Sequence, residues 1–246
     1  FDNATEKTLP SGNGARAVAS YNGNPWIETQ KPDYEILLHW SHLDWLFDDA
    51  QAEATFRAGE YWRGAMPAGV KTDRDGTLYV SVPRWEAGIP ATVNRIQMVD
   101  GTPILVPYPS VAMNRIGDPA ALQSVLGWEI DEHNRAWFLD QGHIQGQPCI
   151  EGAQKIVCWD LTRNELVVSI PIPDEIASYQ ASFLNDLVVD NRSGFVYIAD
   201  SGIFSDPLQG GLIVCNTRTG ALRRVLHQHL STQDVPGYWF EIAGKQ

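Results

Sequence analysis

Three apolar runs follow one another in residues 184–226: Asn185-Asp-Leu-Val-Val-Asp190, Phe195-Val-Tyr-Ile-Ala-Asp200 and Gly211-Leu-Ile-Val-Cys215. Each run is rich in Val, Ile, Tyr or Phe, the residue types that favour strands. The segments between the runs are rich in Asp, Asn, Ser and Gly, which favour turns. The stretch therefore predicts three consecutive strands, each antiparallel to the one before it.

The same pattern recurs at a regular interval. An Asp that precedes a tight turn and an aromatic strand occurs at Asp73, Asp131 and Asp190, with spacings of 58 and 59 residues. Cys158 and Cys215 repeat at a similar spacing of 57 residues. All-β units of this size are typical of propeller blades, each of which needs neighbours to cover its sheet. We therefore predict an all-β propeller of four-stranded blades, with about four blades in this chain, and turn-stabilising roles for the three Asp residues.

Local patterns assign the remaining segments. We expect one domain over residues 1–246, with an irregular segment at 1–33, a strand within 34–45 and an outer helix at 48–58. A second helix is predicted at 119–126, because Asp118 suits an N-cap and Pro119 suits the first helical position. A further strand begins at Tyr238. Either the units close as a small propeller, or the propeller is incomplete at its C-terminus and missing sequence or a second chain supplies the other blades.

Composition and missing motifs exclude several classes of function. The net charge of −12 argues against nucleic acid or an anionic membrane as the main partner. No apolar run approaches the length of a membrane span. The sequence has no Gly-x-Ser-x-Gly elbow, phosphate-binding loop, zinc-type spacing or dinucleotide fingerprint. The chain starts at Phe1 rather than Met, as expected of a mature or trimmed form.

The three cysteines, Cys149, Cys158 and Cys215, leave at least one thiol unpaired within the chain. A bond between Cys149 and Cys158 would close a short loop, and the sequence leaves that pairing open. Cys149 has no convincing His partner, so chemistry by a thiol nucleophile is unsupported. Two glycosylation triplets begin at Asn3 and Asn191, and the second lies in a predicted exposed turn.

One segment resembles a known family: Ser81-Val-Pro-Arg-Trp-Glu-Ala-Gly-Ile-Pro-Ala-Thr-Val-Asn94 is similar to a stretch of the Yellow / major royal jelly protein family. Other pieces agree in order, among them Asn185-Asp186 and Tyr197-Ile-Ala-Asp200, so the resemblance covers roughly residues 34–245. The resemblance implies a secreted six-bladed propeller, of which this chain lacks two C-terminal blades.

Ligand sites of propellers are expected where inner strands and loops meet at one end of the central channel. Asn185 and Asp186 start an inner strand, so their side chains could bond a ligand or transfer a proton. Their oxygens could also hold a divalent cation such as Ca²⁺, although no cofactor is required. The alternative is that Asp186 only caps backbone N–H groups at a blade junction.

Arg84 and Trp85 follow the second strand of a blade. Arg84 could pair with a carboxylate or stack on a quinone ring, and Trp85 could form an aromatic wall. Arg84 could equally fix a loop to a neighbouring blade. Trp128 is placed with Glu129 at the position that Asn185-Asp186 takes in the next unit. It is therefore a candidate to line the site, although core packing is the commoner fate of a Trp in a sheet.

Four further candidates follow the ends of equivalent strands: Gln141, His143, Asp200 and Ser201. All four could face the same end of the channel. His143 is a candidate proton shuttle, because imidazole changes charge near neutral pH. The alternative is a solvated His in a loop.

Function is suggested mainly by the resemblance, which covers diverse activities: dopachrome conversion, binding of biogenic amines, nutrition and, in related fungal propellers, cycloaddition of quinone methides. We predict a secreted protein that binds an aromatic or quinone-like molecule in its channel and promotes a non-hydrolytic rearrangement or cycloaddition, which needs mainly orientation and a few hydrogen bonds. The alternatives are a non-catalytic protein that binds amines, to which the acidic chain is suited, and a structural or storage protein.

Overall fold

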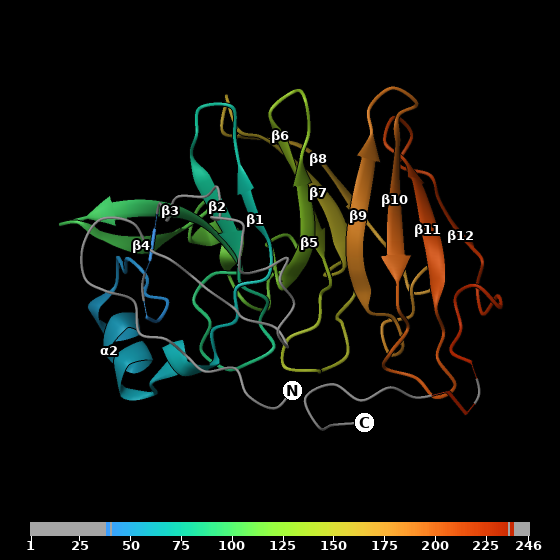
Figure 1. The fold of residues 1–246 in the computed structure, drawn as a ribbon, viewed down its shortest axis with the longest axis horizontal. Coiled ribbons are helices and arrows are strands. Elements are labelled where there is room, and N and C mark those ends of the chain that lie inside the picture. Colours follow the sequence, from blue (N-terminus) through green and yellow to red (C-terminus); the bar gives the residue numbers. More distant parts are fainter. Residues whose placement is uncertain (1–37, 40, 236, 239–246) are drawn as a thin grey trace, which may run out of the picture. The chain divides into compact units, whose positions relative to one another are not determined.

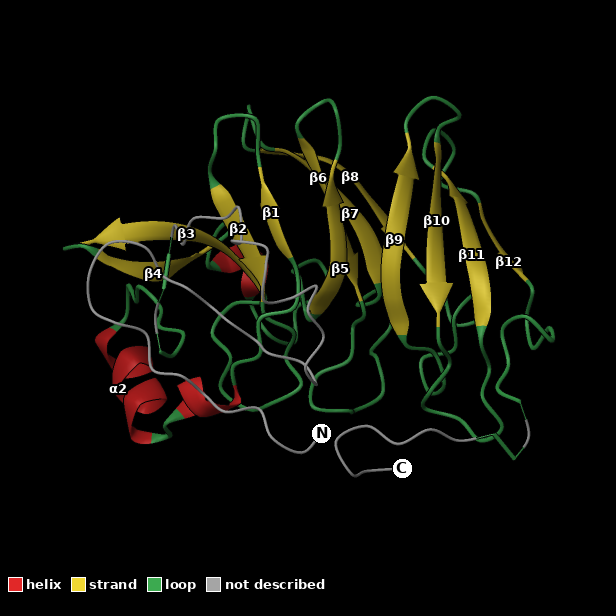
Figure 2. Ribbon diagram, viewed as in Figure 1, coloured by secondary structure: helices red, strands yellow, loops and turns green. Residues whose placement is uncertain are grey.

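The described part of the chain is built from three antiparallel sheets of four strands each (Figures 1 and 2). A computed structural model describes residues 38, 39, 41–235, 237 and 238, and within it His42–Val235 form one compact unit. The strands of the first sheet are β1 (Val70–Thr72), β2 (Leu78–Ser81), β3 (Val93–Val99) and β4 (Thr102–Pro107). Those of the second are β5 (Val125–Ile130), β6 (Arg135–Asp140), β7 (Lys155–Asp160) and β8 (Glu165–Pro171). Those of the third are β9 (Leu184–Asp190), β10 (Phe195–Asp200), β11 (Gly211–Asn216) and β12 (Leu222–Val225).

Within each sheet the strands lie in chain order, which confirms the predicted propeller blades of four locally connected strands. The turn aspartates are also confirmed. Asp73 Oδ1 accepts hydrogen bonds from two backbone N–H groups of its turn, and Asp131 and Asp190 do the same in theirs. The repeat was visible in the sequence because these bonds are local to each turn.

The second sheet is buried on both faces, as a blade between two neighbours should be. Trp137 and Leu139 of β6 belong to the core shared with the third sheet, whereas Ala136 and Phe138 belong to the core shared with the first. Side chains alternate between the two faces of a strand, so one strand serves both cores. The third sheet differs, because Val188 and Tyr197 on its other face are 62% and 38% exposed.

The first strands of the sheets come together as inner strands. β5 contacts both β1 and β9. At Gly127 the approach to β9 is so close that a Cβ atom would lie 2.5 Å from the backbone of Asp186. This position therefore needs glycine for reasons of space. The inner strands bring the same ends of the three sheets into one region.

Helices are few in the described residues. The predicted helix at 48–58 is confirmed as α2 (Ala50–Ala58), which begins after Asp49, whose carboxylate accepts a hydrogen bond from the N–H of Gln51. α2 buries Phe56 against Trp45, with ring centroids 5.4 Å apart. Two short 3₁₀ turns lie at Tyr61–Gly64 and Ala112–Asn114. No helix among the described residues is long and apolar enough to cross a membrane.

The helix predicted at 119–126 is wrong. Only a short turn follows Asp118, and β5 already begins at Val125. The backbone N–H groups of Gln123 and Ser124 donate to the carboxylate of Asp140 instead of joining a helix. A contact with a distant residue has therefore overridden the local helix signals.

The N-terminal and C-terminal expectations fall mostly outside the described residues. Residues 1–37 and 239–246 are not described, which covers the irregular segment and most of the last expected strand. Of the strand predicted within 34–45, the described residues show only an isolated bridge between Trp45 and Leu105. The described residues contain three complete sheets, whereas the repeat predicted about four blades. The prediction divided the length of the whole chain by the repeat length, and so included the terminal segments that are not described.

All three cysteines are free and buried. Burial raises the pKa of Cys149 and Cys158 to about 12 and that of Cys215 to about 11. The open question of a Cys149–Cys158 bond is thereby answered: the structure contains no such bond. Thiols with such high pKa values are poor nucleophiles at neutral pH.

Asp131 gives the fold a dependence on acid. Burial alone would raise the pKa of its carboxyl, but hydrogen bonds from Arg135 and from the Trp137 indole outweigh burial and hold that pKa below its ordinary value. A carboxyl with a lowered folded pKa stabilises the fold above its unfolded pKa, and this contribution is lost as the pH falls through the folded pKa. In Asp131→Asn we expect a lower free energy of unfolding at neutral pH and a shallower loss below about pH 4.

Urea denaturation between neutral and acidic pH, followed by tryptophan fluorescence, measures both effects. Glu151→Gln is the control. It removes a carboxylate at an exposed turn, so it shows how much of the effect comes from losing a charge and how much is specific to Asp131. Wild type and Asp131→Asn losing stability in parallel below pH 4 would contradict the expectation.

Candidate functional site

At one end of the sheets, the second strand of each sheet (β2, β6 and β10) ends close to the start of an inner strand, β5 or β9. β6 ends at Asp140, which pairs with Val125 at the start of β5, and β10 ends at Asp200, which pairs with Leu184 at the start of β9. Figure 1 shows this end of β9 and β10 at the bottom of the view. After β2, the N–H of Arg84 donates to the Ser124 hydroxyl, just before β5, at 3.0 Å. Residues that follow β2, β6 and β10 are therefore gathered at one end of the sheets.

Asp200, a sequence-predicted ligand contact, is buried and fully engaged. Its Oδ1 accepts hydrogen bonds from the N–H groups of Phe183 and Gly202, and its Oδ2 accepts from the Ser182 hydroxyl and pairs with Arg224 at 2.7 Å. The carboxylate thus ties the start of β9 to the loop after β10. Its contribution to a site is to hold these backbones in place.

Asp140 repeats this arrangement one sheet earlier. Oδ1 accepts from the N–H groups of Ser124 and Gly142, and Oδ2 accepts from the N–H of Gln123 and pairs with Lys155 at 2.8 Å. Asp140 and Lys155 are both essentially inaccessible to solvent. The loop that carries Gln141 and His143 therefore starts from a rigid anchor.

Arg84 is 1% exposed, and its guanidinium donates only to backbone carbonyls. The five acceptors are the carbonyl oxygens of Ile89, Pro90, Asn114, Leu122 and Gln123, at 2.6–3.1 Å. Burial lowers the pKa of Arg84 to about 10. The sequence left two roles open for Arg84, contact with a ligand or the fixing of a loop, and this geometry supports the fixing of loops. The fixed backbone of Arg84 also positions the next residue, Trp85.

Four aromatic side chains from segments that flank the strands of the three sheets contact one another in series. They are named here the ring cluster: Trp85, His143, Phe183 and Phe204. Trp85 and Phe183 have centroids 6.5 Å apart with planes at 31°. Phe183 meets Phe204 edge to face at 5.6 Å, and Phe204 lies 4.9 Å from His143. Phe204 is 40% exposed, so the cluster is open to solvent on that side.

Sequence reasoning missed Phe183 and Phe204. Phe183 directly precedes β9, and Phe204 follows β10 as Trp85 follows β2. The signal that could have found them is this equivalence of position between repeats. Both lie in turn-rich segments whose apolar residues carry no strand pattern.

Gln141 connects the ring cluster to the inner strand. Its amide oxygen accepts a long hydrogen bond of 3.4 Å from the Trp85 indole, and its amide nitrogen donates to the carbonyl of Leu184 at 2.9 Å. Gln141 is 1% exposed, so a ligand would meet its neighbours rather than this amide.

One ring nitrogen of His143 has no hydrogen-bond partner in the described part of the chain. Nδ1 lies 2.8 Å from the carbonyl oxygen of Gln147. Because a carbonyl oxygen can only accept, Nδ1 carries the hydrogen in the neutral ring and Nε2 is the acceptor. Nε2 is buried and has no hydrogen-bond partner within the described part of the chain. Such a nitrogen can accept a proton from a bound molecule.

Asn185 and Asp186 lie at a β-bulge, where the pairing of β9 with β10 shifts by one residue. Both side chains are exposed. Asn185 donates to the Ser201 hydroxyl at 3.1 Å, so these two predicted residues are brought together at the edge of the site. Asp186 accepts a hydrogen bond from the N–H of Leu187 and lies against Gly127 of the second sheet. This resembles the alternative role left open by the sequence, in which Asp186 caps backbone N–H groups at a blade junction.

The described residues contain no group of three or more His, Cys, Asp or Glu side chains placed to hold a metal ion. Ca²⁺ takes about six to eight oxygen ligands. Asn185 and Asp186 supply two side chains, and the amide of Asn185 is turned toward Ser201. A cation there stays a prediction from the sequence, and no step proposed below needs it.

Trp128 belongs to the core between the first and second sheets, where it packs on Phe138 at 5.5 Å. The register makes Leu126 and Gly127 equivalent to Asn185 and Asp186, so the alignment that placed Trp128 and Glu129 there is wrong by two residues. The Trp128 indole N–H has no described hydrogen-bond partner and faces Gly69.

Of the two glycosylation triplets, Asn3 lies outside the described residues. Asn191 lies in the predicted turn between β9 and β10. Its amide donates to Glu132 at 2.7 Å and accepts from Arg135 at 2.7 Å. A glycan on Asn191 would replace the bond to Glu132, and its presence stays a prediction.

Comparisons with known proteins agree with the fold. The family model described as Major royal jelly protein matches residues 123–242. "Protein yellow" of Drosophila madeirensis is 33% identical over 175 residues, covering 65% of this chain and 30% of that protein. "Major royal jelly protein 9" of Apis mellifera is 30% identical over 178 residues, covering 68% of this chain and 41% of that protein. The matched part is thus less than half of each relative's length.

The matched region includes the second and third sheets, with their paired Asp anchors and most of the ring cluster. The first sheet, with its Pro83-Arg84-Trp85 segment, extends the same architecture toward the N-terminus. By these similarities and its blades of four strands, the chain belongs to the Yellow / major royal jelly protein family.

Proposed function

We propose that the protein is a secreted propeller that binds an aromatic or quinone-like small molecule at the ring cluster and promotes its rearrangement by proton transfer. The observation that carries the proposal is the unpartnered Nε2 of His143 beside the ring of Phe204. Trp85 and Phe183 extend the aromatic surface, on which a planar molecule can stack.

The mechanism requires little chemistry from the protein. In an isomerisation of the dopachrome type, a proton leaves a ring carbon and a proton is added at a quinone oxygen, so no oxidant or reductant is consumed. Nε2 of His143 accepts the first proton, while the Nδ1–H bond to Gln147 holds the imidazole in the right tautomer. In this proposal Asn185 and Ser201, whose side chains bond each other at 3.1 Å, bond polar groups of the ligand.

Conversion of dopachrome by the purified chain, followed as loss of its visible absorbance and by chromatography of the product, tests this proposal. Phe204→Ala should raise the KM by about threefold to tenfold, because one aromatic contact is lost. Phe195→Ala is the matched control, since this ring contacts Tyr197 rather than the ring cluster. Equal KM values for the two variants would remove the ring cluster from the proposal.

A second candidate function is non-catalytic binding of a cationic amine. The net charge of −12 and the exposed carboxylate of Asp186 beside the site favour it. Saturable binding of dopamine without any turnover of dopachrome would select this function. Absence of both would leave the structural or storage role.

A further inference from the structure

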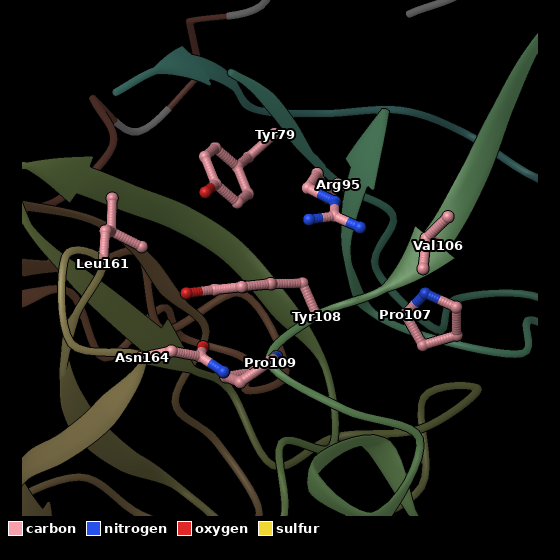
Figure 3. A pocket seen from close by; sticks show the side chains of 8 residues that line it. All are labelled: Tyr79, Arg95, Val106, Pro107, Tyr108, Pro109, Leu161 and Asn164. Carbon is pink, nitrogen blue, oxygen red and sulfur yellow. The ribbon is translucent and has the colours of Figure 1, made fainter. Parts of the chain in front are cut away.

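A cavity lies away from the ring cluster, between the first and second sheets. It has a volume of about 400 Å³ and is named here the tyrosine pocket. Tyr79 and Arg95 line it from β2 and β3, Val106 and Tyr108 from the end of β4, and Leu161 and Asn164 from the turn between β7 and β8 (Figure 3). The volume is within the usual range of small-molecule sites.

The tyrosine pocket and the ring cluster lie at opposite ends of the second sheet. Gln141 and His143 follow the end of β6 at Asp140. β7 is antiparallel to β6, with Asp160 at its end paired to Arg135 at the start of β6. The turn after Asp160 is therefore at the far end from His143, and ligands at the two sites would not compete.

The phenols of the pocket are neutral hydrogen-bonding groups. The rings of Tyr79 and Tyr108 meet edge to face at 4.9 Å. Burial raises the pKa of Tyr79 well above its ordinary value and that of Tyr108 to about 12. Tyr79 donates to Asp73 at 3.1 Å, so this nearby carboxylate is already engaged.

Arg95 is the cation of the pocket. Its guanidinium is exposed, and within the described residues no carboxylate lies within ion-pair distance of it. Its one described hydrogen bond, to Gln97, is long at 3.4 Å. In Figure 3 the guanidinium lies above the Tyr108 ring, at the side of the pocket formed by Val106 and Pro107. The guanidinium fork is thus available for a carboxylate, which it binds through two parallel hydrogen bonds.

The remaining walls are apolar and stiff. Pro107 and Pro109 flank Tyr108, and Leu161 closes the opposite side. Asn164, which also lines the pocket, accepts a hydrogen bond from the Trp159 indole at 3.1 Å and keeps its amide N–H₂ as a donor. The cavity therefore combines an aromatic and apolar body with donors at its edge. This combination suits a flat apolar molecule that carries one negative charge.

We propose that the tyrosine pocket binds a small aromatic carboxylate, whose acid group pairs with Arg95 and whose ring packs on Tyr108. The site is separate from the one proposed for catalysis. It gives an acidic protein a local preference for an anion, opposite in sign to the cationic ligand considered for the ring cluster.

Three probes with one ring and different charge test the proposal: phenylacetate, phenylacetamide and phenethylamine. The readout is the indole N–H signal of Trp159 in ¹⁵N NMR, assigned with Trp159→Phe, because this group bonds Asn164 at the pocket. Phenylacetate should shift the signal saturably, and the neutral and cationic probes should bind at least about tenfold more weakly.

Arg95→Gln should weaken phenylacetate binding by about tenfold to a hundredfold, and Arg95→Lys by less, because lysine keeps the charge but loses the fork. Arg163→Gln is the matched control, since Arg163 lies in the same turn as Leu161 and Asn164 but does not line the pocket and pairs with Glu165 at 3.3 Å. Phe204→Ala should leave phenylacetate binding unchanged, which separates this site from the ring cluster. Equal binding of the three probes, no saturable shift, or full binding by Arg95→Gln would overturn the proposal.

Discussion

Asp140→Ala is expected to lower the free energy of unfolding by about 3–5 kcal/mol, a large part of the roughly 5–15 kcal/mol of a typical domain. The substitution leaves the Lys155 ammonium, which is 1% exposed, without its counter-ion. It also removes the acceptor of three backbone N–H groups at the start of β5 and the loop after β6. Urea denaturation followed by tryptophan fluorescence measures the loss.

The double variant Asp140→Asn with Lys155→Met identifies the cause. It leaves no uncompensated charge, so it should recover part of the stability lost in Asp140→Ala. Recovery should be incomplete, because Lys155 also donates to the carbonyls of Ala121 and Ala153. Glu165→Ala, which breaks an exposed pair with Arg163, should cost less than about 1 kcal/mol. A similar cost for Asp140→Ala would show that the buried pair does not hold this end of the second sheet together.

The blades could be predicted because their signals are local. The turn aspartates accept hydrogen bonds from N–H groups two to four residues away, so a few consecutive residues determine each turn: Asp73, Asp131 and Asp190. The helix wrongly predicted at 119–126 shows the limit. Its N–H groups bond Asp140, 16 and 17 residues further along the chain, and no local pattern contains that contact.

The candidate site was less predictable than the fold. The Asp131–Asp190 spacing of 59 residues, counted back from Asn185, gives Leu126, which the strand register confirms as its equivalent; the placement of Trp128 there departed from the repeat. Arg84 could be chosen as a candidate, but its acceptors lie in loops up to 39 residues away, and a sequence does not show whether a guanidinium meets a ligand or carbonyl oxygens. The position of His143 was predicted, while the free state of its Nε2 required the structure.

His143→Asn is expected to lower the kcat of dopachrome conversion by about a hundredfold to ten-thousandfold, with little change in KM. Asparagine can keep a donor near the position of Nδ1 and so preserve the bond to Gln147, but it has no atom in place of Nε2. The variant therefore removes the proposed proton acceptor while leaving the loop and the stacking surface intact. A loss of kcat alone is the signature of a group that acts in the transition state.

His133→Asn is the matched control, because His133 is exposed in the turn before β6 and far along that strand from His143. The two variants change the same atoms, so a difference in kcat reports position rather than the loss of an imidazole. If His143→Asn converts dopachrome as fast as wild type while Phe204→Ala weakens its binding, the ring cluster binds the molecule without His143 as its base. If His143→Asn raises KM but keeps kcat, the imidazole contributes to stacking on Phe204 and not to proton transfer.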